Sequence, residues 1–243
     1  MLGRDPWTRA CALRFGGLGV HDGVRVNDPL TTLWFVDCDI DANGSDGIGQ
    51  GSPARAKIYL RDCSIHNNTH HGVVGGNLMS LMNCLVYNNT GSGIKHEGEN
   101  GHLFIEHCTV DSNQADGVTL TAPDELRVFE CRNNIFSNNG DVGLPPVGYG
   151  VNFAGAFPEG RRGPNCYFRN GKGAVSVDGM DPALGGITDV DVDGTAVTAD
   201  PQYVSAPSNF ALQSTSPCID AGLPGVMPVG GTGYNSMGAL IPD

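Results

Sequence analysis

A fixed frame of residues repeats five times between Leu33 and Leu144 and restricts the possible folds more than any other feature of the sequence. The frame can be aligned on five register marks: Cys38, Cys63, Cys84, Cys108 and Asn134. Five residues after each mark stands an asparagine: Asn43, Asn68, Asn89, Asn113 and Asn139. Nine residues after each mark a glycine precedes a branched apolar residue, from Gly47-Ile48 to Gly143-Leu144. The positions three residues before and two residues after each mark carry apolar side chains or cysteine, which suit burial.

The marks are 25, 21, 24 and 26 residues apart, and a constant frame at such a period is typical of a solenoid. The apolar positions alternate over short stretches, which is strand periodicity and not helix periodicity. Each repeat is therefore predicted to form three short strands separated by bends, stacked in parallel about 4.8 Å from the next repeat. In this stack the asparagines are expected to form a ladder of amide hydrogen bonds. The glycines are expected to occupy bends that need a positive φ.

The apolar alternation, the asparagine bend and the Gly-Ile or Gly-Val re-entry resemble the right-handed parallel β-helix proteins of the pectate-lyase-like superfamily. This resemblance implies an all-β fold, a single-stranded right-handed parallel β-helix (solenoid) of about six to seven coils. The C-terminus resembles the closing segment of bacterial surface β-helix proteins in Asp200–Tyr203, Phe210–Leu212, Ser216–Gly222 and Gly238-Ala239. Because this architecture carries lyases, hydrolases, phage spikes and non-catalytic modules, it implies a fold and not an activity.

The chain is predicted to be one domain in three parts. Residues 1–30 form an irregular first coil at the N-terminal edge. Residues 31–177 form the β-helix coils with an insertion at 145–164, after which a sixth coil re-enters at Ala174-Val175. Residues 178–243 form an Asp-rich loop and the closing segment. The N-terminal edge is expected to be covered by another subunit or by a further domain, because an open strand edge invites association.

Charge and hydropathy exclude several partners. The formal net charge of −12 opposes binding to nucleic acid, which requires basic surface. The sequence has no apolar run long enough for membrane insertion and no apolar core of a signal peptide near Met1. We therefore expect a protein of the cell surface or extracellular space whose leader was removed, or a virion protein assembled inside a cell.

One outward strand face carries candidate catalytic residues. Asp37 and Asp39 lie on the second strand of one coil, and Asp62 and His66 are expected on the same face of the next. Two carboxylates one coil apart can bind Ca²⁺ or share a proton, so that one acts as an acid. A solvated β-helix face without chemistry is the alternative, since polygalacturonase-like motifs are absent.

Two further candidate sites lie toward the C-terminus. Asp189, Asp191, Asp193 and Asp200 follow the D-x-D-x-D-G spacing of a calcium loop, although Val190 and Val192 also fit a strand with its carboxylates outward. In the insertion, Tyr149, Phe153, Arg161 and Arg162 are candidate substrate-binding residues, because aromatic rings stack on sugars and guanidinium groups bind acidic substituents. Packing of these aromatic rings onto the coils or onto a subunit is the alternative.

Histidine-rich runs at His70-His71 and Lys95-His96-Glu97 form a fourth candidate. His70 and His96 fall in different columns of the stack, so a shared metal site does not follow from the repeat. Surface polar residues without a ligand are the alternative interpretation.

Two functions fit this sequence. The first is a non-catalytic structural or recognition protein of a phage tail, a head surface or a cell surface, which contacts glycans or other subunits and forms a homo-oligomer. The second is a polysaccharide lyase or glycoside hydrolase acting on acidic polysaccharide, with Ca²⁺ as a possible cofactor. Absence of a recognisable catalytic set favours the first.

Overall fold

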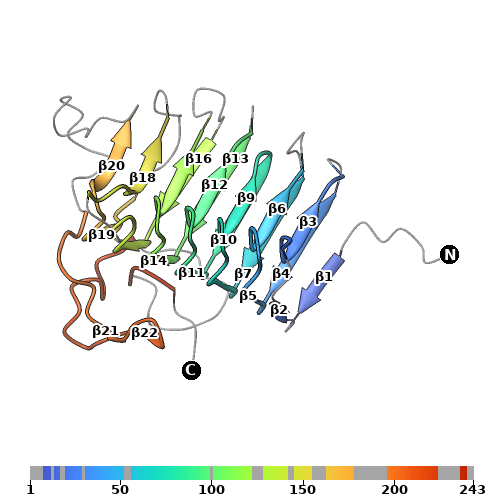
Figure 1. The fold of residues 1–243 in the computed structure, drawn as a ribbon. Helices are drawn as coiled ribbons and strands as arrows, with labels where there is room; N and C mark the ends of the chain where they lie inside the picture. The colour runs from blue at the N-terminus through green and yellow to red at the C-terminus, as the bar shows by residue number, and fades with distance from the viewer. Residues whose placement is uncertain are drawn as a thin grey trace.

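The computed structural model describes residues 8–11, 14–16, 20–28, 31–51, 56–98, 101–121, 128–141, 145–154, 163–177, 196–223 and 236–239. It is an all-β solenoid whose coils lie side by side in chain order (Figure 1). Each complete coil contributes one strand to each of three parallel sheets, as the repeat predicts. Within the described residues, no helix has the length and apolar character needed to cross a membrane.

The three sheets are named A, B and C. Sheet A contains β1 (Thr8–Cys11), β4 (Thr32–Val36), β7 (Lys57–Arg61), β10 (Leu78–Met82), β13 (His102–Glu106) and β16 (Val128–Arg132). Sheet B contains β2 (Arg14–Gly16), β5 (Asp39–Asp41), β8 (Ser64–His66), β11 (Leu85–Tyr87), β14 (Thr109–Asp111), β17 (Ile135–Ser137) and β19 (Cys166–Phe168). Sheet C contains β3 (Val24–Val26), β6 (Ile48–Gln50), β9 (Val73–Gly75), β12 (Ile94–His96), β15 (Val118–Leu120), β18 (Tyr149–Phe153) and β20 (Gly173–Val177).

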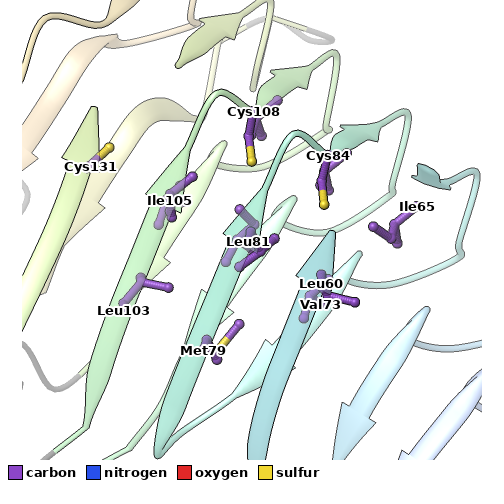
Figure 2. Packing of buried hydrophobic residues seen from close by; sticks show 14 of the residues in the cluster. Leu60, Ile65, Val73, Met79, Leu81, Cys84, Leu103, Ile105, Cys108 and Cys131 are labelled. Carbon is purple, nitrogen blue, oxygen red and sulfur yellow. The ribbon is translucent and has the colours of Figure 1, made fainter. Parts of the chain in front are cut away.

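Equivalent residues of successive coils pair across every sheet, and their inward side chains fill the solenoid. The sheet B register runs Ile40, Ile65, Val86, Val110, Phe136 and Tyr167. Figure 2 shows inward side chains of this core, including Leu60, Leu81, Ile105 and Cys131 from sheet A. Burial of such apolar side chains is the main favourable contribution to folding. Because equivalent residues are stacked, the position of a residue within its coil determines whether its side chain is buried.

The predicted asparagine ladder is present and extends one coil further. The Nδ2 group of each asparagine donates to Oδ1 of the next, at 2.9–3.0 Å, through Asn43, Asn68, Asn89, Asn113, Asn139 and Asn170. A second, short ladder joins Asn134 to Asn165 at 3.0 Å. These amides are buried except for Asn170, which is partly buried, and mutual hydrogen bonding offsets the cost of burying them.

The prediction of positive φ at the glycine column is wrong. The left-handed residues stand instead in two other columns, one before the register mark and one before the ladder asparagine: Asp37, Asp62, Asn83, His107 and Asn133, and Ala42, Asn67, Asn88, Ser112 and Asn138. Asp and Asn tolerate this conformation better than most residues. The glycines serve close packing, since a Cβ on Gly72 would lie 2.5 Å from the Gly93 carbonyl oxygen.

The fifth coil re-enters later than the repeat predicts. Gly150-Val151 occupies the expected place of Gly143-Leu144, because Val151 pairs with Val118. Gly143 and Leu144 lie outside the described residues. The added length lies between Gly140 and Gly148, and the Cβ of an alanine at Gly140 would overlap the backbone of Gly148.

The C-terminal residues lie against the outer face of sheet B. β21 (Tyr203–Ser205) and β22 (Asn209–Leu212) form an antiparallel hairpin on this flank of the solenoid (Figure 1). Cys218 and Met237 form a small core with Ile135 and Cys166 of sheet B. Val197 adds a parallel bridge to Cys166 at the last strand of the sheet, so this part of the chain covers both a face and an edge.

Candidate functional site

The uncovered part of sheet B carries an Asp–His pair. Asp39 and His66 come from adjacent coils, and Nε2 of His66 lies 3.0 Å from Oδ1 of Asp39. The amide of Asn67 donates to Nδ1 of His66 at 2.8 Å. The His66 ring stacks on Tyr87 with ring centroids 4.6 Å apart. The predicted face therefore exists, and both nitrogens of its histidine are engaged.

The other two predicted catalytic residues lie at the bend before this face. Asp37 is exposed, and both Asp37 and Asp62 have a positive φ. Asp62 accepts from Nε of Arg61 at 3.1 Å and from Nδ2 of Asn83 at 2.7 Å. The Asp62 carboxylate thus has a guanidinium and an amide as its partners.

The C-terminal segment encloses the other end of the sheet B face. Ser137 Oγ lies 2.9 Å from Tyr203 Oη and donates to Asp111 Oδ1. Phe210 packs on Tyr87 with centroids 5.0 Å apart, next to the His66 ring. Burial, followed by the nearby Asp111 carboxylate, raises the pKa of Tyr203 well above its usual value. The hairpin therefore ends beside the Asp39–His66 pair.

The predicted substrate-binding role is wrong for the two aromatic residues that the structure describes. Tyr149 and Phe153 belong to β18 and are only 8% and 0% exposed. Phe153 packs edge-on against Phe129 in the core, because the coil re-enters at Gly150 and converts the first part of the expected insertion into a strand. Arg161 and Arg162 lie outside the described residues.

The predicted calcium loop remains a prediction. Asp189, Asp191 and Asp193 lie outside the described residues. Asp200 is exposed, and its carboxylate accepts a hydrogen bond from the backbone of Gln202 at 2.8 Å.

The outer face of sheet A carries an aromatic stripe that sequence reasoning missed. The stripe is defined as Trp34, Tyr59 and Phe104, which lie in one outward column with Ser80 between the last two. The rings of Trp34 and Tyr59 are stacked, with centroids 4.0 Å apart and planes 7° apart. These residues are half-buried and therefore present part of each ring to solvent.

Two further outward columns, which carry mostly long side chains, lie on either side of the aromatic stripe. Lys57, Leu78 and His102 occupy the preceding outward column, and Arg61, Met82 and Glu106 occupy the following one. Arg132 pairs with Glu106 at 3.1 Å. A signal for the stripe was present in the sequence, since its residues stand four positions before the register marks.

The chemistry of this face differs from that of sheet B. A parallel sheet with aromatic rings along its axis offers flat apolar surface with polar groups at its sides, the combination that binds the apolar face of a sugar while bonding to its hydroxyl groups. Successive coils place the Tyr59 and Phe104 rings about 10 Å apart along the axis. The face therefore fits an extended chain more readily than a single small molecule.

Comparison with known proteins supports the architecture. The sequence matches the family profile "Right handed beta helix region" over residues 18–158. Among solved structures, a similar chain is titled "Crystal structure of pectate lyase Pel9A"; it is 14% identical, with a TM-score of 0.36 over 87% of this chain and 73% of that one. No curated protein sequence matches the chain. The profile match covers more than half of the sequence, from the first coil into the fifth.

Proposed function

Because the chain belongs to the right-handed β-helix family, whose architecture carries many activities, we propose that it is a non-catalytic recognition protein that binds glycan chains. The aromatic stripe on sheet A carries the proposal. Its rings follow the axis of the solenoid, so an extended saccharide lying along the axis contacts several coils at once. Such a protein serves as a surface component of a virion or a cell.

The charge of the protein favours a neutral glycan. With a formal net charge of −12, the protein repels polyanions at a distance. Two of the cations beside the stripe are also matched by nearby acids, since Arg61 pairs with Asp62 and Arg132 pairs with Glu106. Stacking and hydroxyl contacts, rather than ion pairing, therefore provide the affinity.

Affinity electrophoresis in gels that contain soluble neutral glucan or galactomannan tests the proposal. Retardation is expected for the wild type, and Tyr59→Ala should weaken binding about tenfold because one stacking surface is lost. Ser80→Ala is the matched control, since Ser80 lies in the same outward column without a ring. Equal mobility of Tyr59→Ala and Ser80→Ala in every gel that retards the wild type would overturn the assignment to the stripe.

A polysaccharide lyase or glycoside hydrolase is the second candidate, and the Asp39–His66 pair favours it. An imidazole held by a carboxylate can accept or donate a proton during cleavage of a glycosidic bond. The decisive assay incubates the protein with uronate polymers and follows unsaturated product in the ultraviolet, together with reducing ends. Turnover that is lost in His66→Ala and Asp62→Ala but kept in Ser80→Ala would replace the binding proposal by catalysis.

Assembly is a separate part of the proposal. A surface component that binds weakly at each site gains avidity from repetition, so we propose a homo-oligomer. Native mass measurement checks this, and a monomer at all accessible concentrations would contradict it.

A further inference from the structure

A corner of the solenoid gathers two histidines and a carboxylate from adjacent coils. Asp46 lies at the bend between β5 and β6, and His70 and His71 lie at the equivalent bend of the next coil. One ligand atom from each of the three side chains lies within 4.8 Å of the other two. The two imidazole rings are 3.9 Å apart, with an angle of 48° between their planes.

The backbone holds this corner in place. Asp46 Oδ1 accepts from the backbone N–H of His71 at 2.9 Å and from Nδ1 of His70 at 2.7 Å. His71 Nδ1 in turn accepts from the backbone N–H of Ser92 at 2.9 Å. A Cβ at Gly91 would lie 2.5 Å from His71 Nδ1. The lack of a side chain at Gly91 therefore permits this position of the imidazole.

The electrostatics of the corner suit a cation. Asp22 pairs with Arg25 at 3.1 Å, and Lys95 pairs with Glu97 at 2.6 Å, so these neighbouring charges cancel. The carboxylate of Asp46 is left as the net charge of the group.

The geometry points to a transition-metal site of the zinc class at Asp46, His70 and His71, which joins two adjacent coils. Imidazole nitrogen with carboxylate oxygen selects Zn²⁺, Co²⁺, Ni²⁺ or Cu²⁺ over Ca²⁺ and Mg²⁺, which prefer all-oxygen sites. His71 binds through an unprotonated ring nitrogen, and because Nδ1 is that nitrogen while it accepts from Ser92, the imidazole exchanges this hydrogen bond for the ion. His70 also binds as a neutral imidazole, through one ring nitrogen, and keeps its single ring proton on the other.

Small side-chain movements bring the three groups to bonding distance. Two ligand atoms on one zinc ion, each about 2.0–2.1 Å from the metal, are at most about 4.2 Å apart. The three ligand atoms lie within 4.8 Å of one another, so they have to approach by less than about 1 Å. The His70 side chain is 57% exposed and can rotate. Asp46 is held by the backbone N–H of His71, and the His71 ring has to turn away from the Ser92 N–H. Water completes the coordination on the solvent side.

Titration of chelator-treated protein with ZnCl₂ tests the site by calorimetry and by the shift in melting temperature. One equivalent of Zn²⁺ should bind and raise the melting temperature, and CaCl₂ should not compete. His70→Ala should weaken Zn²⁺ affinity by about tenfold or more, with His70→Gln as a second variant that keeps the side-chain bulk. Because His70 is exposed, both variants should melt like the wild type without metal.

His102→Ala is the matched control, since His102 lies on the outer face of sheet A, away from this corner. The seven cysteines whose side chains the structure describes are buried free thiols, and all cysteines are common to the variants, so a difference between His70→Ala and His102→Ala reports on the corner alone. Equal Zn²⁺ affinity of these two variants, or no Zn²⁺ binding by the wild type, would refute the site.

Discussion

Replacing one asparagine in the middle of the ladder should destabilise the protein far more than replacing its exposed neighbour. Asn89 is fully buried. Its Oδ1 accepts from Nδ2 and the backbone N–H of Asn68, at 2.9 and 3.1 Å. Its Nδ2 donates to Asn113 Oδ1 at 2.9 Å and to the Ile65 carbonyl at 3.3 Å. Asn89→Ala removes all four contacts.

The polar groups that lose a hydrogen-bond partner in Asn89→Ala determine how much unfolding free energy is lost. The Asn68 backbone N–H loses its acceptor in a buried place, which costs about 1–3 kcal/mol. The Nδ2 group of Asn68 keeps only a 3.4 Å contact with the Ile40 carbonyl, and the Ile65 carbonyl loses a donor; each adds about 1 kcal/mol. Asn113 Oδ1 still accepts from the backbone of residue 89. The expected loss in unfolding free energy is therefore about 4 kcal/mol, a large part of the about 5–15 kcal/mol typical of a domain.

Urea denaturation followed by far-ultraviolet circular dichroism measures this loss. Thr90→Ala is the matched control, because Thr90 is the next residue and its side chain is exposed; it should change stability by less than about 0.5 kcal/mol. Since solenoids can unfold in more than one step, the first transition is the one compared. A difference below about 1 kcal/mol between the two variants would show that the amide column does not hold adjacent coils together.

Three further predictions concern packing, thiols and pH. Gly72→Ala should cost about 1–3 kcal/mol in the same denaturation assay, because its Cβ would meet the Gly93 carbonyl oxygen at 2.5 Å; unchanged stability would contradict close packing at this bend. The seven cysteines whose side chains the structure describes should resist Ellman's reagent in the native protein and react after unfolding, because they are at most 3% exposed; rapid native reaction of any of these seven would show that the core opens. Burial lowers the pKa of His96 from 6.5 to about 4, so only the unfolded chain binds this proton between those values. The contribution of His96 to the free energy of unfolding should be complete above pH 6.5 and should fall by about 3 kcal/mol toward pH 4. Denaturation of His96→Leu at the same pH values should not show this decrease.

Some features of the two outward faces could be read from the sequence. The strand register follows from the repeat, and it correctly placed Asp39 and His66 on one face of sheet B. The contact itself did not follow, because Asp39 is directly paired with Ser64 and His66 is paired with Asp41. His66 reaches Asp39 diagonally, and Tyr87 stacking on its other side helps to set the ring orientation. Side-chain direction depends on such neighbours and not on the period.

The corner with Asp46 shows the same limit. The sequence identified His70-His71 as unusual but compared it with His96, whose side chain points inward and is 1% exposed. The relevant partner was Asp46 on the previous coil, in the same column as His71. The repeat therefore makes Asp46 and His71 neighbours, but the contact of His70 with Asp46 depends on side-chain direction, which the period does not fix.

The sequence by itself determined the parallel β-helix, the inward columns and the asparagine ladder, because a coil repeated by translation places like residues in contact with like. Only the tertiary structure decided the features that break the repeat. It selected Gly150-Val151 over Gly143-Leu144 as the fifth re-entry, since only the later pair aligns with Val118. It also placed Tyr203 and Phe210 against sheet B. These contacts join residues that are distant in the chain and share no period, so shape and burial, rather than spacing, determine them.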